Sequence, residues 1–403
     1  MIHDVQAKLD GLERHWECVV IGGGPAGAIA AICSAKAGLK TLLIERHALG
    51  KHKVCGACLN HRALRVLTSL GLHDAVRRLE GQSTHSFWLK GFGGELERRV
   101  PEGFAVSRSR LDRLLVTTAI EAGASVIDRV TATVEAPASS AADAQPNGTR
   151  GVRLNSVRQQ NEIRIQAKAI VVADGLGHPS LKSTEFEERI AESSHVGIGA
   201  VVIDGRDSMP WVRPHTIHMA AASGGYAGLV LVEGGDVNLA AAVDPTFLRA
   251  CGSPEKAFSA LLGEAGFPSL PASTMSLGHR RQWRGTPSLS RSINRVASER
   301  VFVVGDASGY VEPFTGEGMA WAMHGGALVT RSVKIAVSGD LETAEADWAQ
   351  DWRRQIYQSQ RTCRRLAWLL RHPTVAKFGV SIAARFPGLT GRLIDQFDVE
   401  LSA

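Results

Sequence analysis

A short strand, a glycine-rich turn and an alanine-rich helix near the start of the chain constrain its fold more than any other feature. In "CVVIGGGPAGAIAAICSAKAG" an apolar run from Cys18 to Ile21 leads directly into three glycines, and residues 26–37 then predict a helix that ends at Gly38. The glycines follow the G-x-G-x-x-G spacing as Gly22, Gly24 and Gly27. This order of elements is typical of an α/β fold built on a parallel sheet.

Each glycine has a separate physical role in such a turn. The first allows the tight bend, the second lets the backbone approach a pyrophosphate, and the third lets the helix pack closely on the strand. A second apolar strand, "KTLLIE", ends in Glu45, eighteen residues beyond Gly27. An acid at that point accepts hydrogen bonds from ribose hydroxyls and repels a 2′-phosphate. These features predict a dinucleotide site and leave both NAD and FAD open.

Size and composition set the broad class of the protein. The 403 residues exceed an average domain and favour two closely joined units. The hydrophobic content of 44% and the charged content of 21% are ordinary for a globular protein. The N-terminal residues do not resemble a secretory signal, and six irregularly spaced cysteines do not form a disulfide framework. We therefore expect a cytoplasmic protein.

A second strand, turn and helix lies near the other end of the chain. "RVFVVGDASGYVEPFTGEGMAWAMHGGALVT" predicts a buried strand over 301–304 and a helix over 319–329. The segment resembles the second FAD signature of the flavoprotein family that contains para-hydroxybenzoate-type hydroxylases, flavin-dependent halogenases and geranylgeranyl reductases. The resemblance implies that Asp306 holds the ribityl chain, and that the backbone of residues 316–319 faces the flavin pyrimidine ring.

Two more segments resemble the same family, and all four occur in the family's order. "VSRSRLDRLL" matches the helix that enters the FAD site, and "AIVVADGLGHPSL" matches the Asp-Gly motif. The resemblance implies FAD as the cofactor. We find no second strand followed by G-x-G-x-x-G, so NADH or NADPH would visit only transiently as the electron donor. The expected cofactor-binding residues are Gly22, Gly24, Pro25, Ala26, Gly27, Glu45, Arg46, Lys53, Cys55, Gly56, Arg108, Asp174, Gly175, Gly305, Asp306, Pro313, Gly316, Glu317, Gly318 and Met319.

The pair Cys55 and Cys58 in "KHKVCGACLN" has three interpretations. A zinc site needs about four ligands, and no second C-x-x-C or H-x-x-x-H pair completes one, so we expect no metal. A redox dithiol is the second interpretation, because C-x-x-C spacing lowers a thiol pKa. The third is a resemblance to the K-x-C-G segment of geranylgeranyl reductases. It implies that Cys55 lies beside the flavin ring as a candidate catalytic residue, while Cys58 packs in the following helix.

Residues 194–243 contain four strand-like runs with small, aliphatic side chains. By resemblance they form an antiparallel sheet that covers the flavin and supplies a substrate pocket, which would suit an aromatic or lipid-like molecule. Its isolated polar side chains are Tyr226, His215, His218 and Asn238, of which Tyr226 and His218 are the candidate substrate residues. The chain lacks the halogenase W-x-W-x-I-P segment, and Gly228 stands where geranylgeranyl reductases commonly have a tryptophan.

The C-terminal region is basic. Nine basic residues and no acid lie between Arg353 and Arg392. Two interpretations of this charge are open. The segment is either a solvated helical face or a surface that binds an acidic partner or an anionic membrane. No nucleic-acid-binding motif accompanies the charge, so we expect no nucleic-acid partner.

The expected fold is α/β, with a Rossmann-like FAD-binding domain, an inserted antiparallel substrate sheet and a C-terminal helical cap. The expected boundaries are 15–85, 100–185 and 290–335 for the FAD-binding domain, 86–99 and 186–289 for the sheet, and 336–403 for the cap. The expected function is an FAD-dependent oxidoreductase that hydroxylates a hydrophobic small molecule or reduces its double bond. The alternatives are a flavin electron carrier that docks to a protein partner, and a thiol-disulfide flavoenzyme that uses Cys55 and Cys58.

Overall fold

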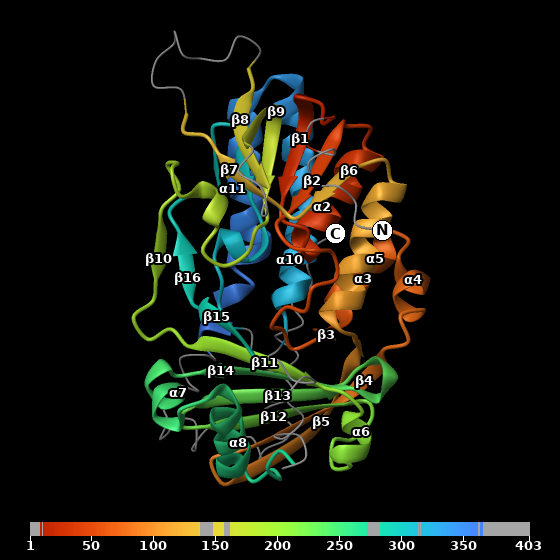
Figure 1. Ribbon diagram of the computed structural model, residues 1–403, viewed down its shortest axis with the longest axis vertical. Coiled ribbons are helices and arrows are strands. Elements are labelled where there is room, and N and C mark those ends of the chain that lie inside the picture. Colours follow the sequence, from red (N-terminus) through yellow and green to blue (C-terminus); the bar gives the residue numbers. More distant parts are fainter. Residues whose placement is uncertain are drawn as a thin grey trace.

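Two eight-stranded sheets organise the described part of the chain. In Figure 1 the first sheet and its helices occupy the upper part of the molecule, and the second sheet lies across the lower part. The computed structural model describes residues 9, 11–137, 148–156, 162–271, 283–312, 314, 316–361 and 363–365.

The first sheet has a parallel centre. Its strand order is β17-β18-β9-β1-β2-β6, and β7 and β8 extend it beside β9. Helices α2, α5 and α10 cover one face, and the β7–β8 pair lies over the other. The strands are β1 (His15–Ile21), β2 (Thr41–Glu45), β6 (Ser125–Asp128), β7 (Val130–Val134), β8 (Arg150–Ser156), β9 (Glu162–Val172), β17 (Ala297–Ser298) and β18 (Val301–Val303). The helices are α2 (Pro25–Lys36), α5 (Arg108–Glu121) and α10 (Gly318–Ser338).

The turn between β1 and α2 leaves no room for larger side chains. At Gly22, where φ is +106°, an added Cβ would lie 2.3 Å from the carbonyl oxygen of Ala173. At Gly27 it would lie 1.9 Å from the carbonyl oxygen of Gly22. The predicted strand–turn–helix is therefore present, and its first and third glycines are required by close packing.

The second sheet is antiparallel except where β4 and β12 run parallel. Its order is β15-β11-β14-β13-β12-β4-β5-β3, and α7 (Pro245–Cys251) and α8 (Pro254–Ala265) lie beside it. Its strands are β3 (Cys58–Leu59), β4 (Gln82–Gly91), β5 (Gly94–Ala105), β11 (Val196–Val202), β12 (Thr216–Ala222), β13 (Gly225–Leu231), β14 (Val237–Val243) and β15 (Arg284–Ser288). The β4–β5 pair runs from 82 to 105, beyond the expected 86–99, because Ala105 still pairs with both Gln82 and Cys58.

Side chains alternate between the two faces of this sheet. On β14, Val237, Leu239 and Ala241 belong to a core shared with α8. Asn238 points the other way, since its side chain bonds to the loop after β2. The face that carries Asn238 is therefore turned toward the first sheet.

The chain ends, as far as it is described, in helical structure beside α10. Helix α11 (Leu341–Asp351) is followed by a π-helical turn, Trp352–Tyr357. Trp348 is fully buried, and its indole N–H donates to the carbonyl of Val303 at 3.2 Å. Residues 366–403 of the expected cap lie outside the described residues. Among the helices that are described, none is both long and apolar enough to cross a membrane.

Short elements complete the connections between the two sheets. Helix α3 follows β3, and its N-cap Asn60 accepts a hydrogen bond from the N–H of Ala63 at 3.0 Å. The short elements are α3 (His61–Ser69), α4 (His73–Arg77), α6 (Gly205–Ser208), β10 (Glu188–Ile190), β16 (Arg291–Ile293), and the 3₁₀ turns Pro179–Leu181, Glu233–Gly235 and Gly305–Ser308.

Candidate functional site

A cavity of about 1050 Å³ lies at the carboxyl ends of the parallel strands, where open α/β sheets bind their ligands. Its volume is at the upper end of the roughly 300–1000 Å³ that is usual for ligand sites. Most of the expected cofactor-binding residues line it, although they come from four separate segments. These residues are Gly22, Gly24, Pro25, Ala26, Glu45, Arg46, Lys53, Cys55, Gly56, Arg108, Asp174, Gly175, Gly305, Asp306, Gly316, Gly318 and Met319.

Three expected residues are not part of this wall. Gly27 lies beneath it, where α2 packs against the turn. Glu317 is 5% exposed and forms a buried ion pair with Arg62, with 3.1 Å between Oε1 and Nη1. Glu317 therefore anchors the start of α10 to α3. Pro313 lies outside the described residues.

The N-terminus of α2 offers an anion site. Its N-cap Gly24 is extended and no side chain caps the helix, so the first N–H groups are available to a ligand. The first turn carries no acid. The Arg108 guanidinium lies beside this turn, 3.6 Å from the point that a Cβ on Gly24 would occupy. Backbone donors, helix dipole and guanidinium together suit a pyrophosphate.

Glu45 is an ionised acceptor at the end of β2. Its two oxygens accept hydrogen bonds from the N–H groups of Gly23 and His47, both at 2.9 Å. Lys53 Nζ lies 3.3 Å from Oε2. Burial alone raises the pKa of Glu45, but the Lys53 charge and the two N–H donors outweigh it, so the pKa is lowered. The position and charge suit a ribose hydroxyl.

Arg108 is a fixed cation in the same wall. It holds Asp112 through two hydrogen bonds, 2.8 Å from Nε and 3.0 Å from Nη2. Lys53 Nζ lies 3.5 Å from the same carboxylate. Burial disfavours the charged guanidinium, but Asp112 and Cys55 outweigh this effect and raise the pKa of Arg108. The guanidinium is therefore charged at every working pH.

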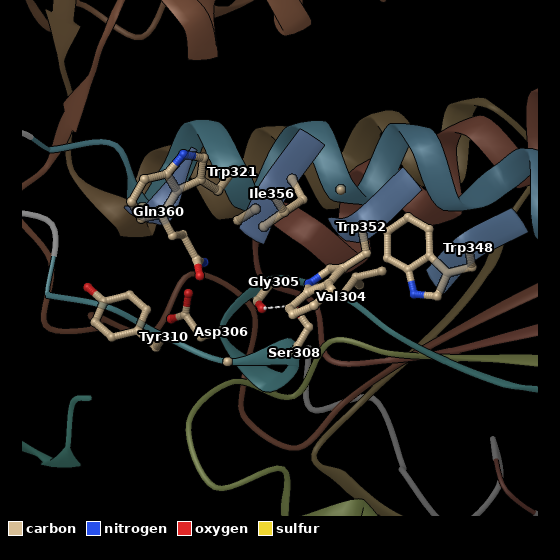
Figure 2. A pocket seen from close by; sticks show the side chains of 14 residues that line it. Val304, Gly305, Asp306, Ser308, Tyr310, Trp321, Trp348, Trp352, Ile356 and Gln360 are labelled. Atoms are coloured by element: carbon tan, nitrogen blue, oxygen red, sulfur yellow. Dashed lines mark hydrogen bonds between the residues drawn. The ribbon is translucent and has the colours of Figure 1, made fainter. Parts of the chain in front are cut away.

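Asp306 lies on the turn that follows β18, where Gly305 packs against Ala26 of α2. Burial raises its pKa to about 6, and the Arg108 charge opposes that shift. Figure 2 shows its carboxyl group directed toward the Gln360 amide, across a second cavity of about 10 Å³. A carboxyl group so poorly solvated is stabilised as an anion by hydroxyl donors, which a ribityl chain provides.

The loop after β2 brings Cys55 and Gly56 to the cavity. Cys58 is not in the following helix as expected, because its backbone pairs with Ala105 and forms strand β3. Burial raises the pKa of Cys58 to about 12, and nearby Cys55 adds to this. Both cysteines are free thiols. Both thiols line the cavity, but a raised pKa leaves little thiolate at Cys58, which counts against the redox interpretation.

The two candidate substrate residues face opposite ways. Tyr226 packs against Phe314, with ring centroids 5.1 Å apart, on the side of the sheet turned toward the first sheet. His218 is fully buried on the other side, where its Nε2 accepts from the N–H of Arg213 at 3.1 Å. Burial lowers the pKa of His218 to about 4, so it stays neutral. His218 is therefore a core residue, and its expected substrate role is not supported.

Two further residues border the site: Tyr310, which the sequence analysis does not single out, and Asn238, which it names only as an isolated polar side chain. Tyr310 lines the cavity, four residues after Asp306. Burial, with the charge of Asp306 next, raises its pKa well above the usual value, so the phenol stays protonated. Asn238 holds the Cys55 loop through its side chain. The available signals were the hydroxyl within the second FAD signature and a lone amide in an aliphatic strand.

These residues fit FAD by their chemistry. The glycine turn and α2 suit a pyrophosphate, Glu45 suits the adenosine ribose, and Asp306 suits the ribityl hydroxyls. No group of three or more His, Cys, Asp or Glu side chains that could hold a metal occurs in the part of the chain that the structure describes.

Comparisons with known proteins agree with this fit. A family described as FAD binding domain matches residues 15–362. The chain is 25% identical over 392 residues to a menaquinone reductase of Mycolicibacterium smegmatis, covering 92% of this chain and 88% of that protein. It is 26% identical over 345 residues to a digeranylgeranylglycerophospholipid reductase of Methanosarcina acetivorans, covering 84% of this chain and 80% of that protein.

Solved structures share the fold. Pseudomonas aeruginosa PqsL in complex with 2-aminobenzoylacetate has a TM-score of 0.69 at 20% identity, covering 91% of this chain and 99% of that chain. The flavin-dependent brominase Bmp2 has a TM-score of 0.70 at 17% identity, covering 95% and 99%. At these identities the likeness concerns the fold alone. It confirms the predicted α/β flavoprotein architecture, and the family match over most of the length confirms FAD. The chain belongs to the FAD binding domain family and is an FAD-dependent oxidoreductase.

Proposed function

We propose that this oxidoreductase reduces a double bond in a hydrophobic small molecule, using FAD that NADH or NADPH has reduced. The observation that carries the proposal is the apolar face of the second sheet beside the flavin cavity. The reductases named above act on menaquinone and on digeranylgeranylglycerophospholipid, and both names describe lipid-like substrates. Their similarity over more than four fifths of this chain favours reduction over hydroxylation.

The apolar face suits a ligand of this kind. Leu89, Met219, Ala221 and Phe314 form a buried cluster on it. Tyr226 and further partly buried aromatic side chains pack against the cluster. At the centre of the sheet Gly228 has no side chain, and Met219 covers it, with Sδ 3.1 Å from the point that a Cβ on Gly228 would occupy. A surface with so few polar groups binds a substrate through its apolar area.

The residues of this chain would divide the work of binding and proton handling. When bound, FAD supplies the hydride chemistry. The N-terminus of α10, at Gly318 and Met319, lines the cavity, and its N–H groups and helix dipole would favour negative charge on a ring bound beside it, by about 0.3–1 kcal/mol. The protonated phenol of Tyr310 and the thiol of Cys55 both lie at the cavity wall. They are the candidate donors of the proton that accompanies hydride transfer.

The electron donor would use the same cavity. Lys51 and Lys182 lie in its wall and can pair with the phosphates of a transiently bound nucleotide. This placement supports NADH or NADPH as the donor. It does not distinguish NADPH from NADH, because two lysines in the wall do not form a specific pocket for the 2′-phosphate of NADPH.

The test is an anaerobic reduction followed by product analysis. The FAD-loaded protein is mixed with NADH or with NADPH, and bleaching of the flavin absorbance is followed. The reduced protein is then given a menaquinone or a geranylgeranyl lipid, and product masses are measured. We expect a gain of two hydrogens. A gain of one oxygen in air would instead identify a hydroxylase, and oxidation only by a protein acceptor would identify an electron carrier.

A further inference from the structure

One buried amide joins the second sheet to the loop that borders the flavin cavity. The Nδ2 of Asn238 donates to the carbonyl oxygen of Cys55 at 2.8 Å. Asn238 is 3% exposed and lies in β14, between Val201 of β11 and Val230 of β13. An amide in such aliphatic surroundings costs free energy unless it is hydrogen-bonded. The contact with the Cys55 carbonyl is what compensates for its burial.

This bond fixes the plane of the peptide between Cys55 and Gly56. In a trans peptide the C=O and the N–H point in opposite directions. The carbonyl points into the sheet at Asn238, so the N–H of Gly56 points away from the sheet. Gly56 is exposed and lines the cavity. Across the described residues, its N–H has no acceptor.

Other contacts keep the same loop from moving. The N–H of Val106 donates to the carbonyl of Ala57 at 2.9 Å. Val54 lies against the sheet, since a Cβ on Gly199 would stand 3.1 Å from its Cγ1. The loop is therefore held on both sides of the Cys55–Gly56 peptide, and a donor placed there is preorganised.

We propose that Asn238 is a positioning residue, which aims the N–H of Gly56 into the cavity as a fixed hydrogen-bond donor to an electron-rich atom of the FAD ring system. The inference rests on FAD as the cofactor and on the ring lying beside the Cys55 loop. It does not depend on the substrate or on the electron donor. A donor of this kind binds the reduced ring better than the oxidised ring, because the reduced ring carries more negative charge.

The first experiment compares Asn238→Ala with a control in the same strand. FAD affinity is measured by titrating FAD-free protein, and the midpoint potential of bound FAD is measured without substrate or nicotinamide. We expect Asn238→Ala to weaken FAD binding about 3- to 10-fold, as for one lost hydrogen bond, and to lower the potential. The control is Val243→Ala, which removes core packing on the opposite face.

The second experiment changes the donor itself. Gly56→Pro removes the N–H, whereas Gly56→Ala keeps it, and an added Cβ there meets no atom within 4 Å. We expect Gly56→Pro to lower the potential as Asn238→Ala does, and Gly56→Ala to lower it less. Because both changes act on one bond, the double variant with Asn238→Ala should add little to Gly56→Pro.

Two outcomes would overturn the inference. If Asn238→Ala lowers the melting temperature as Val243→Ala does but leaves the potential unchanged, Asn238 is only a structural residue. If Gly56→Pro and Gly56→Ala shift the potential equally, the N–H is not the donor. Neither measurement involves turnover, so a failure of the proposed reductase activity would be seen separately.

Discussion

The buried carboxyl groups around the cavity differ in charge because their neighbours differ. Glu45 has a lysine and two backbone N–H donors at its oxygens, so its pKa is lowered despite burial. For Asp306 burial is the largest effect on the pKa, and it raises that pKa to about 6. The first carboxylate is stable before FAD binds, whereas we propose that the second gains its hydrogen-bond donors from the cofactor. Asp306 would then couple FAD binding to pH.

Replacing Asp306 by asparagine tests this coupling. A carboxyl group with a raised pKa contributes stability that is present below its unfolded value, 3.8, and is lost as the pH rises through about 6. Without FAD, Asp306→Asn should therefore melt at a higher temperature than the parent at pH 8, and at a similar temperature near pH 4. FAD binding at pH 8 should weaken by about 10- to 100-fold, since a hydrogen bond to a charged group is lost.

The matched control for that variant is Asp74→Asn, whose side chain is 85% exposed. It should leave both the melting temperature and the FAD affinity unchanged. A parent-like FAD affinity in Asp306→Asn would contradict the assignment of Asp306 to the ribityl chain.

Single residues show where sequence reasoning succeeds and where it cannot. Glu45 and Asp306 were found because short motifs fix their positions at strand ends. His218 and Tyr226 are both isolated polar groups in an aliphatic region of the sequence, yet they lie on opposite faces of the sheet. Which face meets the cavity depends on how the sheet packs against α8 and the first sheet. That packing is a tertiary property, and the local sequence does not contain it.

At the scale of elements, the strand–turn–helix units followed from the sequence because their causes are local. Helix α2 begins at Pro25 and helix α10 begins at Gly318, each within one residue of the predicted start. Strand β3 could not be predicted, since two residues carry no periodicity and their pairing partner, Ala105, lies far along the chain. Strand β5 extends past residue 99 for the same reason, since Ala105 at its end pairs with Cys58, far along the chain.

The contact between α2 and the turn gives a prediction for Gly27→Ala. The added methyl would lie 1.9 Å from the Gly22 carbonyl oxygen, so the helix must move away from the strand. We expect a loss of about 1–3 kcal/mol in the free energy of unfolding, as for overpacking, together with weaker FAD binding. Denaturant unfolding and FAD titration measure the two effects.

Gly263→Ala in α8 is the control for Gly27→Ala. An added Cβ meets no atom within 4 Å there, so alanine should stabilise the helix by about 0.5–1 kcal/mol. Equal behaviour of the two variants would mean that close packing at Gly27 does not govern the turn.

At the scale of the whole molecule, the cavity that fits FAD is lined by segments that are distant in sequence. The order of the strands within each sheet depends on long-range pairing, which no motif encodes. The four segments that resemble the flavoprotein family nevertheless line one cavity, as the sequence predicts. They could be recognised because each segment carries its own local signature. The C-terminal helices complete this arrangement: Trp348 bonds to β18, and Gln360 lies beside Asp306.

The basic C-terminal segment gives the last prediction. We propose that residues 353–392, with nine basic residues and no acid, bring the protein to an anionic membrane from which a lipid-like substrate is drawn. The protein should then sediment with vesicles that contain phosphatidylserine, and not with vesicles of phosphatidylcholine alone. Binding should weaken as salt screens the charges. A chain that ends at residue 365 lacks four of these basic residues and should bind less, while its FAD content serves as the control for folding. Equal sedimentation with both kinds of vesicle would rule out charge as the cause.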